Sequence, residues 1–266
     1  MIIDFHTHIF PDQIAEKTVE YLKKEGNIKA FTKGTLAGLK KSMLENNIDI
    51  SVVLPVITKP SQFDTVNSYA AEINGKDGII SFGGIHPDTE DYKEKLETIK
   101  NRGLQGIKLH PDYQKTYVDE PKMIRMIQFA VELGLVVLIH AGLDIGFPNP
   151  IHCTPKRAAN MLSQIESENA KIVLAHMGGF DLWDEVEKYI VGKNVWLDTS
   201  FSLGRIPDKQ FIRIVKNHGI DRTLFATDSP WGGQKETLEY LGKLDFTEEE
   251  LDWILYLNAM ELLGMR

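Results

Sequence analysis

The sequence lacks the features that would place it in a membrane, in an oxidising compartment or on a nucleic acid. Its single cysteine, Cys153, excludes an intrachain disulfide and a cysteine-rich metal site. No stretch reaches the ~18 to 20 apolar residues of a membrane span, and the N-terminus MIIDFHTHIF lacks the positive region and long apolar run of a secretory signal. Acidic residues outnumber basic ones by 38 to 30, and the net charge of −8 disfavours binding to phosphate backbones. We therefore expect a soluble, cytoplasmic protein that binds neither membranes nor nucleic acids.

What the chain does contain is enough apolar material for a large core. Hydrophobic residues make up 42% of its 266 residues, which excludes an intrinsically disordered chain. At ~150 residues per domain the length alone would suggest roughly two domains. However, no proline- or serine-rich linker, charge block or shift in composition divides the sequence. We therefore expect one domain over residues 1–266.

Short apolar segments alternate with longer segments of helical periodicity. The short segments are rich in Val, Ile and Leu, as buried parallel strands are, and cover residues 2–6, 48–54, 79–85, 106–110, 135–140, 171–176, 195–199 and 223–227. The helical segments cover residues 36–46, 64–75, 91–101, 122–133, 156–168, 181–192, 209–218 and 235–241. Eight consecutive βα units in a chain of this length predict an α/β fold, specifically a (β/α)₈ TIM barrel. We also expect an extra N-terminal helical segment at 11–25 and a C-terminal helix that begins at Thr247 with a capping box.

Histidines gather at the carboxyl ends of the predicted strands, which is where TIM barrels place their active sites. Six of the eight lie there: His6, His8, His86, His110, His140 and His176. An acidic residue, Asp228, follows the eighth strand. Eight histidines scattered by chance would fall mostly on surface helices and loops. The pattern therefore indicates a site at the mouth of the barrel.

The tripeptide His6-Thr7-His8 has the spacing of a metal-binding pair. Residues i and i+2 of a strand face the same side, about 6.6 Å apart, so their imidazoles can converge on one ion. Asp4 has the same parity one step deeper, and we expect it to hydrogen-bond a ligand histidine. The alternative is a polar pair at the point where the strand leaves the sheet.

His140 and His176 each end an otherwise apolar strand, and Asp228 ends the last one. Taken singly, either histidine could be a structural residue bound to a backbone carbonyl, and Asp228 could cap a turn. Combined with the histidine pair of the first strand, they predict a site for zinc or another divalent ion. One coordination position would stay open for water.

Several motifs together resemble the amidohydrolase superfamily, and within it the amidohydrolase-2, or amidohydrolase-related, branch. They are Asp4-Phe5-His6-Thr7-His8, Gly106-Ile107-Lys108-Leu109-His110-Pro111, Ile139-His140-Ala141-Gly142, Ala175-His176-Met177-Gly178-Gly179 and Thr227-Asp228-Ser229-Pro230. The branch includes metal-dependent hydrolases, lactonases and decarboxylases of the aminocarboxymuconate-semialdehyde type. The resemblance implies a divalent ion, with zinc expected, held by His6, His8, His140 and Asp228. It also implies that His176, as a non-ligand or a second-ligand histidine, polarises the substrate or the water. Strand parity alone does not decide whether His140 or His176 is the closer ligand.

Lys108 departs from the simplest form of this pattern. Binuclear members of the superfamily carry a carboxylated lysine or a glutamate at the end of the fourth strand, where Lys108 and His110 share the inward parity. Lys108 could bridge two ions in this way, form a salt bridge, or attract a substrate carboxylate. We favour the last two alternatives and hence a mononuclear site.

Weaker candidates for substrate contact lie on the strand ends and in the loops that follow the strands: Lys108, His110, His152, Arg205 and Trp231. For each of them, ordinary loop or surface chemistry is the competing interpretation.

The expected function is metal-dependent hydrolysis of a small carbonyl substrate, namely a lactone, ester or amide that bears a carboxylate, by a metal-activated water. Asp228 would accept the proton of the water, and His176 would stabilise charge or shuttle a proton. The alternative is a non-oxidative metal-dependent decarboxylase of the aminocarboxymuconate-semialdehyde decarboxylase type at the same site. A barrel that binds without catalysis is a third hypothesis. The only expected partner is the small-molecule substrate, and the sequence leaves a homo-oligomer open.

Overall fold

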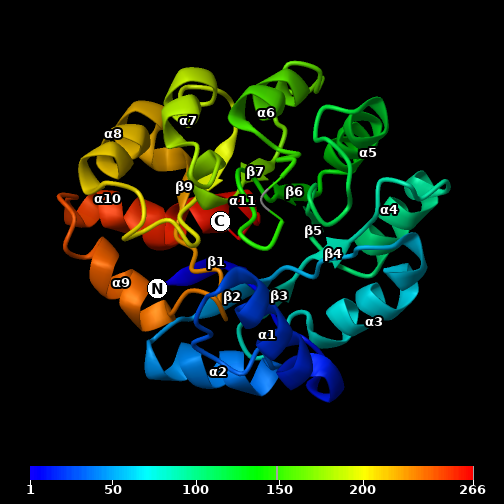
Figure 1. Ribbon diagram of the computed structural model, residues 1–266, viewed down its shortest axis with the longest axis horizontal. Helices are drawn as coiled ribbons and strands as arrows, with labels where there is room; N and C mark the ends of the chain where they lie inside the picture. The colour runs from blue at the N-terminus through cyan, green and yellow to red at the C-terminus, as the bar shows by residue number, and fades with distance from the viewer. Residues whose placement is uncertain (148, 266) are drawn as a thin grey trace.

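Parallel strands form the centre of the molecule, and helices surround them in a ring (Figure 1). The computed structural model describes residues 1–147 and 149–265. Its strands are β1 (Ile3–Thr7), β2 (Ile50–Val53), β3 (Ile79–Ser81), β4 (Gly83–Gly84), β5 (Gly106–Leu109), β6 (Val136–Ile139), β7 (Ile172–Leu174), β8 (Trp196–Asp198) and β9 (Thr223–Leu224). Only Phe82 separates β3 from β4, so these two occupy one strand position, and the eight predicted strands are confirmed.

Each strand pairs with the next strand in the sequence, in the orders β1-β2-β3 and β4-β5-β6-β7-β8-β9. Backbone hydrogen bonds also join the end of this series to its start: Phe5 N donates to Phe225 O (2.9 Å) and Asp228 N donates to His6 O (2.8 Å). Because hydrogen bonds thus connect the last strand to the first, the predicted (β/α)₈ barrel is confirmed. The carboxyl ends of all the strands meet at one end of this barrel.

The helices follow the strands in the predicted order. They are α1 (Asp12–Gly26), α2 (Leu36–Glu45), α3 (Phe63–Ile73), α4 (Tyr92–Asn101), α5 (Pro121–Glu132), α6 (Pro155–Leu162), α7 (Trp183–Tyr189), α8 (Asp208–His218), α9 (Gln234–Leu241), α10 (Glu248–Asp252) and α11 (Asn258–Leu262). The extra helix is α1, and the expected capping box of Thr247 with Glu250 starts α10. Helix α6 ends six residues earlier than predicted. Among the described residues, none of the helices combines the length and the apolar character that crossing a membrane requires.

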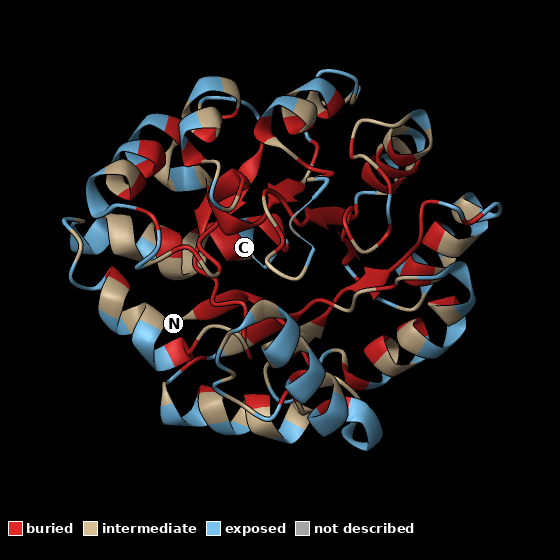
Figure 2. Ribbon diagram, viewed as in Figure 1, coloured by how far each residue is buried: buried red, intermediate tan, exposed pale blue. Residues whose placement is uncertain are grey.

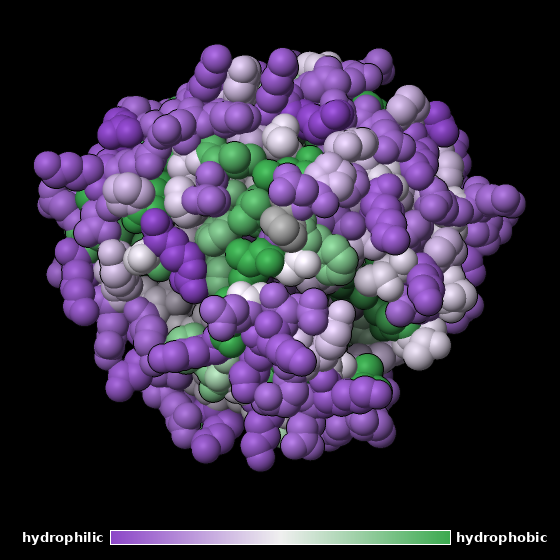
Figure 3. Space-filling view, viewed as in Figure 1, coloured by the Kyte–Doolittle hydropathy of each residue, from purple (hydrophilic) through white to green (hydrophobic). Residues whose placement is uncertain are grey.

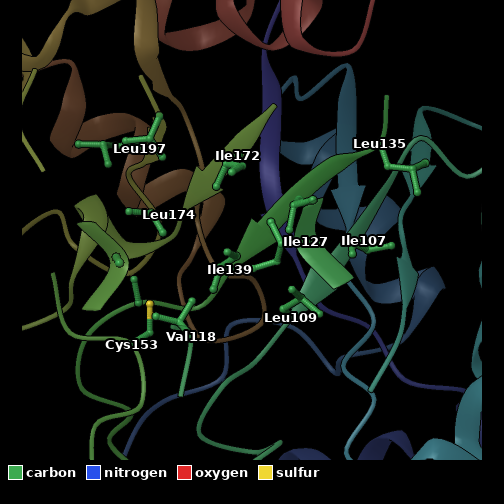
Figure 4. Close-up of a cluster of buried hydrophobic side chains, with 14 of the residues drawn as sticks. Ile107, Leu109, Val118, Ile127, Leu135, Ile139, Cys153, Ile172, Leu174 and Leu197 are labelled. Carbon is green, nitrogen blue, oxygen red and sulfur yellow. The ribbon is translucent and has the colours of Figure 1, made fainter. Parts of the chain in front are cut away.

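Apolar side chains fill the space on both sides of the strands, which explains why the strands read as continuous apolar runs. Burial is concentrated on the strands and on the inner faces of the helices (Figure 2). On the outer face of the barrel, the strand residues Ile107, Ile139 and Ile172 belong to the apolar layer between the strands and the helices (Figure 4). Inside the barrel, Phe5 and Phe82 pack edge to face with ring centroids 5.9 Å apart. This apolar interior supports the polar groups at the carboxyl ends.

Two of the three leucines of α2, Leu39 and Leu44, test how the helix packs on the barrel. Leu39 is fully buried and Leu44 is 82% exposed. We expect Leu39→Ala to lower the free energy of unfolding by about 2–5 kcal/mol, because it removes buried methyl groups and leaves a cavity. Leu44→Ala, its matched control, should change it by less than about 0.5 kcal/mol. Urea denaturation followed by circular dichroism measures both, and equal losses would contradict the observed packing.

Candidate active site

Three side chains from the first strand and from the segments that follow the first and last strands converge at the carboxyl end of the barrel. His6 lies on β1, His8 directly follows it, and Asp228 follows β9. His6 Nε2 and His8 Nε2 are 3.1 Å apart, and Asp228 Oδ1 lies 3.3 Å from the first and 3.2 Å from the second. The barrel register therefore brings together three of the four residues that the resemblance implied as metal ligands.

The chemistry of these three groups suits a divalent cation. His6 Nδ1 donates to Asp198 Oδ2 (2.8 Å), and His8 Nδ1 donates to the backbone oxygen of Leu54 (2.7 Å). In the neutral rings Nδ1 therefore holds the proton, and both Nε2 atoms present lone pairs toward the same point. Bonds of about 2.0–2.1 Å in a tetrahedral site place ligand atoms about 3.3 Å apart, which agrees with the observed spacings. The residues present fit a zinc-like ion.

A buried lysine lies against this cluster. Lys108 Nζ is 3.1 Å from His6 Nε2, and the side chain is almost completely buried. Burial lowers the pKa of Lys108 to about 8, although the nearby carboxylates of Asp198 and Asp228 favour its charged form. Among the residues that the structure describes, Lys108 forms no ion pair, so the salt bridge considered from the sequence is not observed.

His176 and His140 form a second row beside the cluster. His176 Nδ1 donates to the backbone oxygen of Ser200 (3.0 Å), and His176 Nε2 lies 3.0 Å from His140 Nδ1. The other face of His140 stacks on His110 with ring centroids 4.1 Å apart, and His110 stacks in turn on Tyr113 at 3.8 Å. His140 thus lies next to His176 and is not part of the cluster of His6, His8 and Asp228.

A second group of possible ligands consists of His110, His140 and Asp144, whose ligand atoms lie within 4.8 Å of one another. The two imidazole planes are only 11° apart in their stack. The lone pairs of stacked rings lie in nearly parallel planes and do not meet at one point. This group is therefore poorly suited to share an ion, and His140 is better placed to act through Nδ1.

Asp4 hydrogen-bonds a ligand histidine, as the sequence suggested, but through the backbone of His6 and not through its ring. Its carboxylate accepts from Thr227 N (3.0 Å), Thr227 Oγ1 (2.7 Å) and Gln234 Nε2 (2.9 Å), and it reaches only the backbone of His6. Two residues along a strand span about 6.6 Å, so Asp4 lies too deep in the barrel to reach the ring. The carboxylate that orients His6 is that of Asp198.

Sequence reasoning missed Asp198, although the same signal that identified Asp228 could have found it, because Asp198 ends β8. Asp198 is fully buried, and its Oδ1 accepts from His176 N and Ser200 N, both at 3.0 Å, and from Ser200 Oγ. Its two oxygens thereby hold His6 and His176 in one arrangement.

An aromatic-lined cavity opens beside the polar groups. Its lining includes His140, His176 and Asp228 from the site, Tyr21 and Leu22 from α1, and Tyr113, Leu143, Ile145, Phe147, Phe180, Phe201 and Trp231 from the loops. In the view of Figure 3, hydrophobic side chains gather near the middle of the ring of helices and hydrophilic ones surround them. The cavity therefore offers an apolar, largely aromatic surface next to the nitrogen and oxygen atoms of His140, His176 and Asp228.

The weaker candidates for substrate contact occupy different places. Trp231 lines the cavity. The guanidinium carbon of Arg205 lies 3.6 Å from the ring centroid of Phe201, so Arg205 lies beside the lining. His110 is stacked behind the lining, and His152 Nδ1 donates to Asp112 Oδ1 (2.9 Å), so neither of these two lines the cavity.

The loop that supplies part of the lining is fixed at both ends. Gly142 N donates to Cys153 O (2.9 Å), and Leu143 N donates to Phe180 O (3.0 Å). Gly142 has φ of +88°, and a methyl group added there would overlap the backbone of Phe180. Only glycine satisfies both constraints at this position.

The buried histidines predict how stability depends on pH. Burial lowers the pKa of His6, His110 and His140 well below the ordinary value of 6.5. Below pH 6.5 the unfolded chain binds protons on these residues and the folded chain does not, so stability is lost as the pH falls. In the metal-free protein we expect a loss of up to about 1.4 kcal/mol per pH unit for each histidine.

Asp4 acts in the opposite direction, because burial raises its pKa to about 7 and the folded state binds its proton more tightly than the unfolded chain. Three histidines outweigh this one carboxyl group, so the net change between pH 7 and pH 5 is destabilising. Urea midpoints at pH 7, 6 and 5 in the presence of a chelator measure the slope, which His110→Gln should reduce. A midpoint that rises as the pH falls would disprove the prediction.

Comparison with known proteins agrees with this architecture. The chain matches a family model described as "Amidohydrolase" over residues 3–265. No curated protein sequence matches it at a significant level. Similar solved structures include 2,6-dihydroxybenzoate decarboxylase from Rhizobium, with 16% identity, 99% of this chain and 98% of the other covered, and a TM-score of 0.72.

Two further similar structures differ in their described activity. A dihydroxybenzoic acid decarboxylase from Polaromonas with bound manganese and 2-nitroresorcinol has 14% identity, coverages of 99% and 97%, and a TM-score of 0.71. A protein described as a probable 2-pyrone-4,6-dicarboxylic acid hydrolase from Acinetobacter baumannii has 18% identity, coverages of 99% and 99%, and a TM-score of 0.67. At these identities the likeness shows the TIM-barrel fold. With the family match over almost its whole length, the chain belongs to the amidohydrolase family.

Proposed function

We propose that the protein is a metal-dependent hydrolase of a small lactone, ester or amide that carries a carboxylate. The observation that supports this most directly is the convergence of His6 Nε2, His8 Nε2 and Asp228 Oδ1 within 3.1–3.3 Å of one another beside a cavity. A divalent ion held there, zinc being the expected one, would polarise a substrate carbonyl and lower the pKa of a water molecule.

Asp228 supplies the base of the proposed reaction. Burial acts to raise its pKa, but the close contact with His8 and the electrostatic effect of His6 outweigh burial and hold the pKa below its ordinary value. The carboxylate is therefore ionised at neutral pH, and it lines the cavity, where it can accept a proton from water.

His176 is placed to assist on the substrate side. Its ring lines the cavity, and Ser200 O fixes the orientation of Nδ1. Nε2 is therefore the atom that can exchange a proton with the reacting group as negative charge develops. The resemblance implied this role, and the geometry supports it.

Aromatic walls and two cations define the substrate that would fit. Tyr113, Phe180 and Trp231 offer flat apolar surfaces to a planar ring. The ammonium of Lys108 lies deep in the site, and the guanidinium of Arg205 lies near its edge beside Phe201. A ring that bears a carboxylate would satisfy both the apolar walls and a cation.

A second candidate function is non-oxidative decarboxylation at the same site. The aromatic lining favours it, since a planar aromatic acid would fill the cavity, and two of the similar structures are decarboxylases of dihydroxybenzoic acids. In this reaction a carbon atom of the substrate takes up a proton and carbon dioxide leaves, so His176, or Asp228 after it has accepted a proton from water, would act as the acid.

Metal content provides the first test. We expect one divalent ion per chain in the wild-type protein and its loss in His6→Ala, because the remaining ligands no longer close around the ion. The matched control is His86→Ala, which removes a histidine at another strand end whose Nδ1 accepts from Asp88 N. Elemental analysis after gel filtration gives the stoichiometry. A wild-type protein that takes up no zinc or manganese would refute the proposal.

Product analysis separates the two reactions. With a panel of lactones, esters, amides and aromatic acids, hydrolysis of lactones or esters should release one proton per turnover, read by a pH indicator, and decarboxylation should release carbon dioxide. For the substrate that reacts, Asp228→Asn should lower kcat about 10²- to 10⁴-fold, because the proton acceptor is gone. Carbon dioxide without any hydrolysis product would replace the first candidate by the second. An unchanged kcat would remove Asp228 from the mechanism.

A further inference from the structure

A carboxylate outside the predicted site, that of Asp112, faces Nε2 of His140, the ring nitrogen that points away from His176. Asp112 lies in the segment after β5 and is 3% exposed. Its Oδ1 accepts from His152 N (3.0 Å) and His152 Nδ1 (2.9 Å). Asp112 Oδ2 and His140 Nε2 are 3.8 Å apart, and within the described part of the chain both are buried without a hydrogen-bond partner. Two buried polar atoms of this kind need an explanation.

The position of one proton explains why they are unpaired. A neutral imidazole carries a single proton, on either Nδ1 or Nε2. His176 Nδ1 donates to Ser200 O, so His176 Nε2 is an acceptor, and His140 Nδ1 must donate to it across 3.0 Å. His140 Nε2 is then a bare acceptor opposite a carboxylate oxygen. Two acceptors repel, which accounts for a gap longer than a hydrogen bond.

The other tautomer reverses this arrangement. If His140 carries its proton on Nε2, that proton can be donated to Asp112 Oδ2, and Nδ1 is free to bind a cation at the mouth of the barrel. Carboxylates commonly orient metal-bound histidines in this way. We propose that Asp112 is a positioning residue, anchored by His152, that stabilises the Nε2–H tautomer of His140 and so makes Nδ1 available to the metal. This inference rests on the proposed metal-dependent function.

The change requires no net loss of a proton from His140. One proton leaves Nδ1 and one is taken up at Nε2, where Asp112 accepts its hydrogen bond. His140 would then coordinate the ion only once the ion is bound. This explains why His140 lies outside the cluster of His6, His8 and Asp228 in this structure.

Asp112→Asn is a sharp test because it changes a hydrogen-bond acceptor into a donor with little change in volume. The two donors of His152 keep the amide oxygen on their side, so the NH₂ group faces His140 Nε2 and donates to it. This holds the proton of His140 on Nδ1. We expect the zinc affinity, measured by competition with a chromophoric chelator, to fall about 10- to 100-fold.

Asp119→Asn is the matched control. Asp119 lies in the same segment but accepts from Arg157 (2.7 Å) and Asn160 (3.0 Å), away from the histidines. Its zinc affinity should equal that of the wild type. Urea midpoints of both variants without metal show whether either substitution acts through folding.

The tautomer can also be read directly in the wild-type protein, which keeps the test independent of any variant. Ring ¹⁵N shifts should show Nδ1–H for His140 without metal and Nε2–H with zinc. Zinc bound through Nε2, or equal affinities of Asp112→Asn and wild type, would overturn the role of Asp112 and leave the proposed function standing. No zinc binding by the wild type or by Asp119→Asn would overturn both.

Discussion

The arrangement of the site depends on the buried carboxylate of Asp198. A fully buried charge is costly unless several donors satisfy it, and Asp198 receives donors from three residues: His6, His176 and Ser200. These donors come from β1, from the segment after β7 and from the segment after β8. One carboxylate therefore sets the ring orientation of His6 and the backbone position of His176. Loss of Asp198 would therefore affect both the cluster of His6, His8 and Asp228 and the neighbouring pair of His176 and His140.

The chain bends sharply where it presents the site. His176, Met177 and Asp228 all have positive φ, between 55° and 68°, in the left-handed region that residues other than glycine rarely adopt. Such a residue costs about 1–3 kcal/mol and persists only where its surroundings enforce it. At Asp228 the hydrogen bonds of Asp228 N to His6 O and of Trp231 N to Asp228 O enforce it. Two of these three residues, His176 and Asp228, are among those to which we assign chemistry, and strained backbone is common at active sites.

The sequence was sufficient to predict the barrel, because each strand is an apolar run and each helix has its own periodicity. It also placed His6, His8 and Asp228 together, since strand parity and the common carboxyl end decide where such residues lie. It did not predict which nitrogen of a ring faces which partner. The partner of His8 is a backbone oxygen 46 residues away, at Leu54, and such pairings exist only after the barrel closes.

Asp112 shows more clearly that the sequence does not reveal pairings between residues far apart in the chain. It follows His110-Pro111 in a loop, where an aspartate is ordinary turn chemistry. Its partner His152 is 40 residues away. That Asp4 contacts the backbone of His6 and not its ring has a related origin, because parity gives the side of a strand that a residue faces but says nothing about depth along the barrel axis. Depth decided that Asp198 and not Asp4 reaches the His6 ring.

The fixed ends of the loop between Gly142 and Cys153 have a consequence for how the protein can evolve. The bonds from Gly142 to Cys153 and from Leu143 to Phe180 hold the base of the loop independently of what lies between. We therefore expect exchanges at Ile145 and Phe147 to change the lining of the cavity more than the backbone positions of the histidines on the strands. In the proposed enzyme, variation in this segment would alter the choice of substrate while the metal-binding residues on the strands are retained. Gly142 itself is the position at which such variation must stop.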